Sequence, residues 1–116
     1  MGIQDLTDNI ILVDATPEPN LNEELKNAIE IVRERGDCDV IVDFSHVDIV
    51  TSSSLSKLLK LRKLLMDCNR SLVLCSVSKA TKAIFSVTAL DGIFQMEPDK
   101  TSAKVVIDKS AVNQPL

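Results

Sequence analysis

Four consecutive hydroxyl side chains are the most distinctive chemical feature of the sequence. Between a predicted buried strand and a predicted amphipathic helix lie Thr51, Ser52, Ser53 and Ser54. One hydroxyl suffices to cap a helix, and capping alone is the simplest interpretation of the cluster. A helix N-terminus, however, also offers free backbone N–H groups and the positive end of the helix dipole, and so it accepts a phosphate. The segment therefore predicts a phosphorylation switch that changes the surface charge while the helix stays folded.

Other side chains offer little for catalysis or for cofactor binding. His46 is the only histidine, and a solvated or turn-bound histidine is a more plausible role for it than a catalytic base. The sequence contains no G-x-S-x-G elbow, and its three glycines cannot form a Walker A loop or a G-x-G-x-x-G turn. Carboxylates are scattered without the spacing of a calcium loop. We therefore expect no enzymatic activity, no cofactor and no metal site.

The composition indicates a single acidic domain. The 116 residues are 45% apolar and carry a net charge of −4. The lack of Trp and Tyr, together with the acidic charge, argues against nucleic acid as a partner. No stretch reaches the ~18 apolar residues of a membrane span, and the N-terminus lacks the basic and apolar parts of a signal peptide. We expect a cytoplasmic protein without direct membrane insertion, whose three unpaired cysteines are reduced and mostly buried.

Charge is unevenly distributed along the chain. Residues 1–50 carry three basic and twelve acidic side chains, whereas residues 51–88 carry seven basic side chains and one acidic. An acidic helix and a basic helix, each with its charged outer face in solvent, are the simpler explanation of this pattern. A polarised surface that orients a protein partner is the alternative. Lys57 lies in the basic part, just after the hydroxyl cluster, and is a candidate for partner contact.

The spacing of apolar residues predicts alternating strands and helices. The expected strands are 9–14, 40–44, 72–75 and a short edge strand 94–96. The first expected helix follows its cap Asn20 and ends at Gly36, and the second begins at the serines 52–54 and ends at Asn69. The third follows its cap Ser78 and ends at Gly92, and the last runs from about Asp99 to Ile107. Short connections between alternating elements favour right-handed crossovers and therefore an α/β fold with a mostly parallel sheet.

Helical spacing also predicts which helix faces are buried. For the helix that follows the hydroxyl cluster, the expected inner side chains are Leu55, Leu58, Leu59, Leu65 and Met66, with Leu61 and Leu64 beside them. For the helix after Ser78 they are Ala80, Ala83, Ile84 and Val87.

Three segments of the sequence together resemble a known family. Asp43-Phe44-Ser45, a linker and then Thr51-Ser52-Ser53-Ser54-Leu55 are similar to the Asp-Leu-Ser and Asp-Ser-Ser-Gly-Leu pattern of STAS domains, which include bacterial anti-sigma factor antagonists. Residues 72–85 resemble the family's next strand and helix, and residues 90–94 resemble its Gly-Leu-x-x-x-Phe segment. The resemblance implies a single STAS-like domain over 1–110 and a flexible tail over 111–116. The implied fold is a small, mostly parallel or mixed sheet with about four helices packed on it.

The resemblance also implies a function. In the family, a serine kinase that is itself an anti-sigma factor phosphorylates the second serine of the pattern, and the unphosphorylated form binds the anti-sigma factor. By position the acceptor here is Ser53, with Thr51 and Ser52 as alternatives. Thr51 and Ser54 replace the family's Asp and Gly, and Glu18 falls in the first loop, where the family has an Asp. The implied partner surface comprises Glu18, Asp48, Thr51, Ser52, Ser53, Ser54 and Lys57.

Two other functions stay open. A STAS adaptor without phosphorylation, such as a subunit of a membrane transport or signalling complex, is favoured by the missing Asp and Gly. Its docking face would be the basic helix 54–66. A small-ligand or nucleotide-binding module is the third possibility, and the lack of phosphate-cradling glycines argues against it.

Overall fold

The computed structural model describes residues 2–90 and 92–113. Its strands are β1 (Gly2–Thr7), β2 (Ile10–Asp14), β3 (Asp39–Asp43), β4 (Leu72–Cys75) and β5 (Gln95–Glu97). Its helices are α1 (Asn20–Arg35), α2 (Ser52–Asp67), α3 (Lys79–Val87) and α4 (Lys100–Asn113). The strands form one sheet in the order β1-β2-β3-β4-β5, in which β1 is antiparallel to β2 and the other neighbours are parallel. The predicted α/β fold with a mixed sheet and four helices is confirmed.

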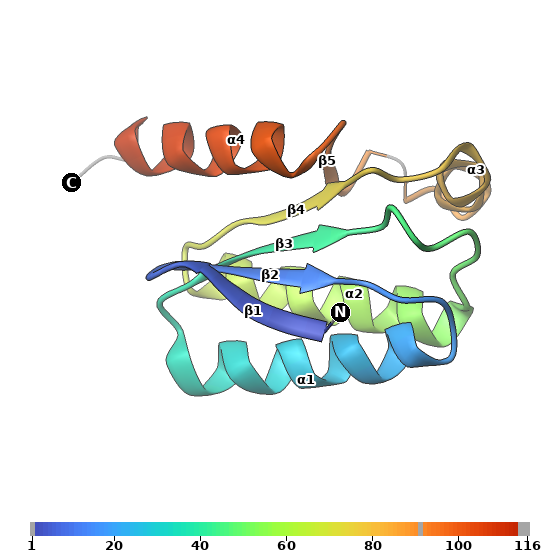
Figure 1. Cartoon of the computed structure of the whole chain (residues 1–116), viewed down its shortest axis with the longest axis horizontal. Coiled ribbons are helices and arrows are strands. Elements are labelled where there is room, and N and C mark those ends of the chain that lie inside the picture. Colours follow the sequence, from blue (N-terminus) through green and yellow to red (C-terminus); the bar gives the residue numbers. More distant parts are fainter. Residues whose placement is uncertain (1, 91, 114–116) are drawn as a thin grey trace.

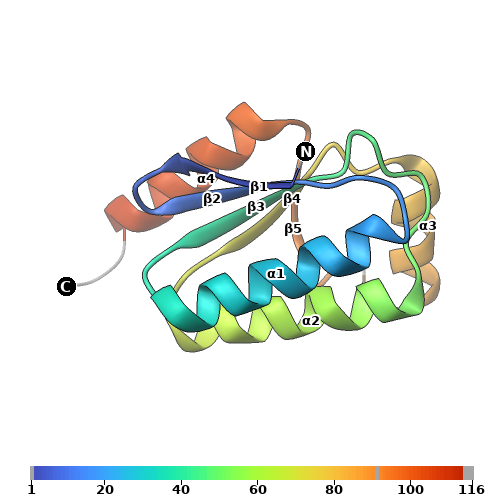
Figure 2. The ribbon, with the colours of Figure 1, turned by 60° about the horizontal axis from the view of Figure 1, so that its bottom comes forward.

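The helices divide between the two faces of the sheet and one of its ends. Helices α1 and α2 lie side by side on one face, and α4 covers the other face (Figures 1 and 2). Helix α3 lies beyond the carboxyl ends of the parallel strands, next to the loop that leads into α2. This arrangement places the N-termini of α1 and α2 together at the carboxyl edge of the sheet.

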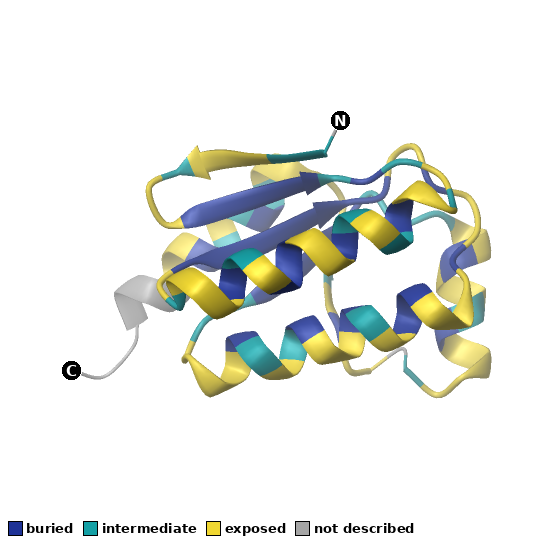
Figure 3. Ribbon diagram, turned by 90° about the horizontal axis from the view of Figure 1, so that it is seen from below, coloured by how far each residue is buried: buried dark blue, intermediate teal, exposed yellow. Residues whose placement is uncertain are grey.

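Both faces of the central strands are buried, as parallel strands covered by helices require. Figure 3 shows β2 and β3 buried behind the half-exposed helices α1 and α2. The side chains that face α1 and α2 include Ile11, Val13, Val40, Val42 and Leu74. Those that face α4 are Ile10, Leu12, Ile41, Val73 and Cys75. Each such aliphatic side chain stabilises the fold by about 1.5–3 kcal/mol through burial, before the loss of chain entropy is counted.

Strand β1 was not predicted from the sequence. Its side chains are partly buried or exposed, without the alternation that marks a strand with one buried face. The strand forms because it pairs with β2 across a tight turn, with a register irregularity between Asp5 and Thr7. Pairing with the neighbouring chain segment, rather than the burial of its own side chains, therefore defines β1.

The predicted helix ends are correct at α1 and α2. Gly36 (φ 68°) and Asn69 (φ 58°) both take the left-handed conformation that ends a helix. The predicted start of α3 is also correct, because the hydroxyl of Ser78 accepts a hydrogen bond from the backbone N–H of Thr81 at 3.1 Å. The predicted cap of α1 is wrong. Asn20 is the first helical residue, and the preceding Pro19 makes no side-chain cap.

The predicted end of α3 is wrong, and its predicted inner face is correct only at Ile84, which is partly buried against the core. The helix ends at Val87, with Ala89 in the left-handed conformation (φ 62°), so Gly92 does not terminate it. The buried side chains are Thr81 and Phe85, whereas Ala80 and Ala83 are exposed, and Val87 is 87% exposed. Phe85, the largest apolar side chain of the helix, is fully buried, and its ring centroid lies 5.5 Å from that of Phe94.

The inner face of α2 is narrower than predicted. Leu58, Leu61 and Leu65 are fully buried, whereas Leu59 is 36% exposed and Met66 is 55% exposed. The helix packs on the sheet and on α1, and this leaves one flank of its broad leucine stripe in contact with solvent.

Two of the three cysteines are buried, as predicted, and Cys68 is exposed. Burial is the main cause that raises the pKa of the Cys75 thiol to about 12, so this thiol stays protonated.

Helix α4 continues past its expected end at Ile107 as far as Asn113. The flexible tail over 111–116 stays a prediction, since 114–116 lie outside the described residues. No helix in the described part of the chain is long and apolar enough to cross a membrane.

Candidate functional site

The hydroxyl cluster lies where two loops meet at the carboxyl edge of the sheet. Strands β2 and β3 are parallel neighbours, and Asp14 is in register with Asp43 at their ends. The chain therefore leaves both strands at the same edge and enters α1 and α2 side by side (Figure 2). As a result, side chains about thirty residues apart in sequence come into hydrogen-bond contact there.

Glu18 connects the starts of the two helices. Its Oε2 accepts hydrogen bonds from the backbone N–H of Thr51 at 2.9 Å and from the Thr51 hydroxyl at 3.0 Å. The carboxylate also accepts from the backbone N–H of Asn22 and is hydrogen bonded to the Ser54 hydroxyl. Partial burial by itself raises the pKa of Glu18, but the hydrogen bonds, led by the one from the Thr51 backbone, outweigh burial and lower the pKa below 4.5. Glu18 is therefore ionised at neutral pH.

Two of the four hydroxyl groups have internal roles. Thr51 is the N-cap of α2, with extended backbone angles, and its Oγ1 accepts a hydrogen bond from the backbone N–H of Ser54 at 3.2 Å. Ser54 is fully buried beneath this cap. The position where the resemblance places a glycine therefore directs its side chain into the protein, toward Glu18 and Asn22, and away from any approaching partner.

Ser52 and Ser53 are the two exposed hydroxyl residues of the first helical turn of α2. The Ser53 Oγ accepts a hydrogen bond from Asn22 Nδ2 at 2.7 Å and another from Lys57 Nζ at 3.4 Å. The sequence does not predict Asn22 as part of the site, because no local motif connects it to a serine 31 residues further along the chain. The hydroxyl of Ser53 thus lies between an amide of α1 and an ammonium group of α2.

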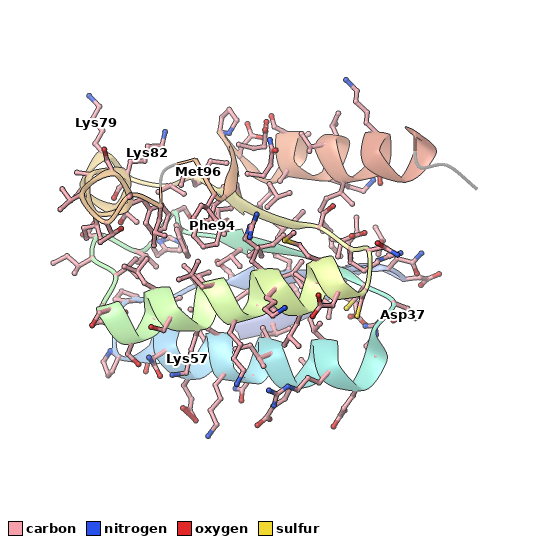
Figure 4. The ribbon with its side chains drawn as sticks, turned by 180° about the vertical axis from the view of Figure 1, so that it is seen from behind. Asp37, Lys57, Lys79, Lys82, Phe94 and Met96 are labelled. Atoms are coloured by element: carbon pink, nitrogen blue, oxygen red, sulfur yellow. The ribbon has the colours of Figure 1, made fainter. Side chains whose placement is uncertain are left out.

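A cationic groove extends from Ser53 along α1 and α2. The groove encloses about 420 Å³, and its lining side chains are Lys26, Ile29, Glu30, Arg33, Ser53, Ser56, Lys57 and Lys60. Four of these side chains are cationic and one is anionic. Figure 4 shows Lys57 where the N-terminal halves of the two helices run side by side. The groove therefore favours anions, although the whole chain is acidic.

Asp48 belongs to a neighbouring part of the same edge. Its side chain is exposed, and its backbone carbonyl accepts a hydrogen bond from the Thr81 hydroxyl of α3 at 3.2 Å. Ile49 follows and is 66% exposed. The structure thus brings Glu18, Thr51, Ser53 and Lys57 together at the start of α2. Asp48 lies in the loop that leads from β3 into α2, at the point where this loop contacts α3.

The described residues contain no group of three or more His, Cys, Asp or Glu side chains that could hold a metal ion. His46 is exposed on the loop after β3. The chemistry available at this edge of the sheet therefore consists of exposed hydroxyl groups, a buttressing carboxylate and nearby cations.

The fold and the site together define a small α/β domain with a hydroxyl-rich, partly cationic surface at the carboxyl edge of its sheet. The family model of the STAS domain matches residues 12–106, and the chain belongs to the STAS domain family. A search among curated proteins finds no match to this sequence.

Several solved structures have the same fold. An anti-sigma-factor antagonist (STAS) domain protein from Planctomyces limnophilus is 17% identical, with 91% of this chain and 96% of that chain covered and a TM-score of 0.76. A variant of RsbS from Moorella thermoacetica is 12% identical, with 95% and 96% covered and a TM-score of 0.81. The Bacillus cell fate determinant SpoIIAA in its phosphorylated form is 15% identical, with 90% and 96% covered and a TM-score of 0.66. At these identities the similarity establishes the fold alone.

Proposed function

We propose that this chain is a regulatory switch of the anti-sigma factor antagonist type. It binds an anti-sigma factor that is also a serine kinase, and phosphorylation of Ser53 ends that binding. The observation that carries the proposal is the exposed Ser53 hydroxyl on the first turn of α2, beside two hydroxyls that are already used internally. The fold shared with an anti-sigma-factor antagonist domain and with a phosphorylated SpoIIAA supports the same choice.

The proposed modification suits the position of Ser53 in its helix. The kinase transfers the γ-phosphoryl group of ATP to the Ser53 Oγ, the hydroxyl proton passes to a base of the kinase, and ADP leaves. The product carries about −1.5 to −2 charges at neutral pH. Negative charge near a helix N-terminus is favourable, so α2 stays folded. The phosphate changes the surface that a partner meets and leaves the core intact.

The two departures from the family pattern are compatible with this function. Thr51 stands where the resemblance places an Asp, and its hydroxyl caps the helix as a carboxylate would. Glu18 supplies a carboxylate at the same helix start from across the edge of the sheet. Ser54 stands where the resemblance places a Gly, and its buried side chain takes no space from a partner.

The test is a kinase assay with mapping of the phosphorylated residue. The chain is incubated with ATP and the anti-sigma factor kinase encoded nearest to its gene. We expect phosphate on Ser53, no phosphate on Ser53→Ala, and full labelling of Ser56→Ala, which removes an exposed hydroxyl one turn further along the same helix. Absence of label on Thr51, Ser52 and Ser53 contradicts the switch and leaves the fold unaffected.

Binding to the same kinase provides a second measurement. Ser53→Asp is expected to weaken binding about tenfold or more, because it adds a negative charge to the surface that the partner contacts, whereas Ser53→Ala should bind as the native chain does. Equal affinity of the Asp and Ala variants would contradict control through this residue.

The exposed apolar side chains of α2 favour a second candidate function, that of an adaptor. Leu59 and Met66 are exposed on this helix, beside the exposed Lys63. An adaptor that docks through this face would lose its partner in Leu59→Asp and keep it in Ser53→Asp. A switch centred on Ser53 would show the opposite sensitivity, so one co-purification experiment with both variants separates the two functions.

A further inference from the structure

The groove between α1 and α2 differs in charge from the rest of the molecule. Lys26 and Arg33 of α1 face Lys57 and Lys60 of α2, and Glu30 is the one carboxylate among the lining side chains. The whole chain, by contrast, has a net charge of −4. Ser53 also lines this groove, at the end nearest the helix N-termini. An anion carried by Ser53 would therefore lie at the entrance of the groove.

The side chains next to Ser53 are already oriented as donors toward its oxygen. Asn22 Nδ2 lies 2.7 Å from the Ser53 Oγ, and Lys57 Nζ lies 3.4 Å from it. Asn22 belongs to α1 and Lys57 to α2, so the two donors approach the Ser53 oxygen from different helices. Lys57 is also four residues after Ser53 on the same helix, the spacing at which side chains of opposite charge pair.

We infer that a phosphate on Ser53 is bound in cis, at the entrance of the groove between α1 and α2, by Lys57 and Asn22 of the same chain. The inference rests on the phosphorylation of Ser53 proposed above and describes how that modification acts. The phosphate oxygens accept charge-assisted hydrogen bonds from the two side chains. Phosphorylation then withdraws Lys57 and the positive charge of the groove from a partner, in addition to adding negative charge.

The charged groups that face this position come from three elements. Lys26, Glu30 and Arg33 lie on α1, and Lys57 and Lys60 lie on α2. The negative charge of Glu18, in the loop before α1, disfavours a phosphate nearby, but its carboxylate is hydrogen bonded to Thr51 and not to Ser53. Most of these groups are exposed, and salt screens their charges. Lys57, which is in direct contact, should therefore contribute most to stabilising the charged phosphate.

The test uses a chain that carries phosphoserine at position 53, installed during synthesis by genetic encoding, so that no kinase is needed. The measurement is the second pKa of the phosphate, followed by phosphorus NMR over a pH titration. Pairing with Lys57 should lower this pKa from its usual value near 6, and Lys57→Gln should raise it by about 0.5 unit relative to the native chain. Lys63→Gln makes the same change of charge on the same helix outside the groove, and it should leave the pKa unchanged within about 0.1 unit.

A second variant tests the contact from α1. Asn22→Asp places a negative charge at the position of the amide, and it should raise the phosphate pKa by an amount similar to that of Lys57→Gln. Identical titrations of the native chain and of Lys57→Gln overturn the inference, as do equal shifts in Lys57→Gln and Lys63→Gln. Since the phosphoserine is encoded, these results do not depend on the kinase assay, which tests the proposed function separately. Circular dichroism of each variant checks that the fold is intact.

Discussion

Glu18 should stabilise the fold in a pH-dependent way, because it joins the first turns of α1 and α2. The perturbation is Glu18→Gln, which keeps the size of the side chain and removes its charge. The amide oxygen can still accept the two hydrogen bonds from Thr51, but the amide nitrogen cannot accept the bond from the Asn22 backbone. Hydrogen bonds to charged groups contribute about 1.5–3 kcal/mol when buried, and Glu18 is only partly buried. We therefore expect a loss of about 1 kcal/mol in the free energy of unfolding, or about 4 °C in Tm.

The pH dependence of this loss follows from the lowered pKa of Glu18. A carboxyl group whose pKa is lowered by folding contributes stability that is fully present above its unfolded value of 4.5. That contribution is lost as the pH falls through the lower pKa of the folded chain. The difference between the native chain and Glu18→Gln should therefore be largest near neutral pH and should shrink in acid.

Urea unfolding of both chains at about pH 7 and about pH 3.5 measures this difference. Glu30→Gln is the matched control, because it removes an exposed carboxylate of α1 that, unlike Glu18, is not hydrogen bonded to Thr51. It should change the free energy of unfolding by less than about 0.5 kcal/mol. Equal stability of Glu18→Gln and the native chain at neutral pH would refute the reasoning, and so would a difference that persists unchanged in acid.

Two further predictions concern the core and the thiols. Phe85→Ala should lower the free energy of unfolding by about 3–5 kcal/mol, since the ring is fully buried against Phe94. Val87→Ala, on the exposed face of α3, should change it by less than about 0.5 kcal/mol. Similar losses for the two variants in urea unfolding would contradict the observed rotation of α3. A thiol reagent should modify one cysteine of the folded chain, Cys68, and all three after denaturation. Rapid modification of Cys75 in the folded chain would contradict its burial and its raised pKa.

The sequence predicts the central part of the fold well, because the strands β2, β3 and β4 are short apolar runs and the helices that follow them have apolar residues at helical spacing. It fails at β1, whose side chains carry no burial pattern of their own. It also fails at the inner face of α3, where small alanines follow a helical period as well as Phe85 does. In the folded chain Phe85 packs on Phe94, and the Thr81 hydroxyl donates to the Asp48 carbonyl, and both contacts hold the same face inward.

The candidate site was predictable in position but not in its internal connections. The run of hydroxyls marks the start of α2, and the resemblance selects Ser53 within it. Local spacing does not indicate that Thr51 and Ser54 are occupied internally, or that Asn22 contacts Ser53. These contacts depend on Glu18, in the loop before α1, and on Asn22 of α1, which reach the start of α2 only because β2 and β3 are parallel neighbours.

The placement of β1 at the outside of the sheet has a consequence for solubility. Its neighbour β2 is a nearly continuous apolar segment, and an apolar strand with an open edge is prone to aggregate with other chains. Strand β1, in which Gln4, Asp5 and Thr7 are polar, covers that edge. Arg35 binds the Asp5 carboxylate of β1 at 3.3 Å and the carbonyl oxygen of Asp8, in the turn after β1, at 2.8 Å. Removing residues 2–7 would therefore expose the unpaired edge of β2. The shortened chain should then form β-rich aggregates at concentrations where the native chain stays dispersed.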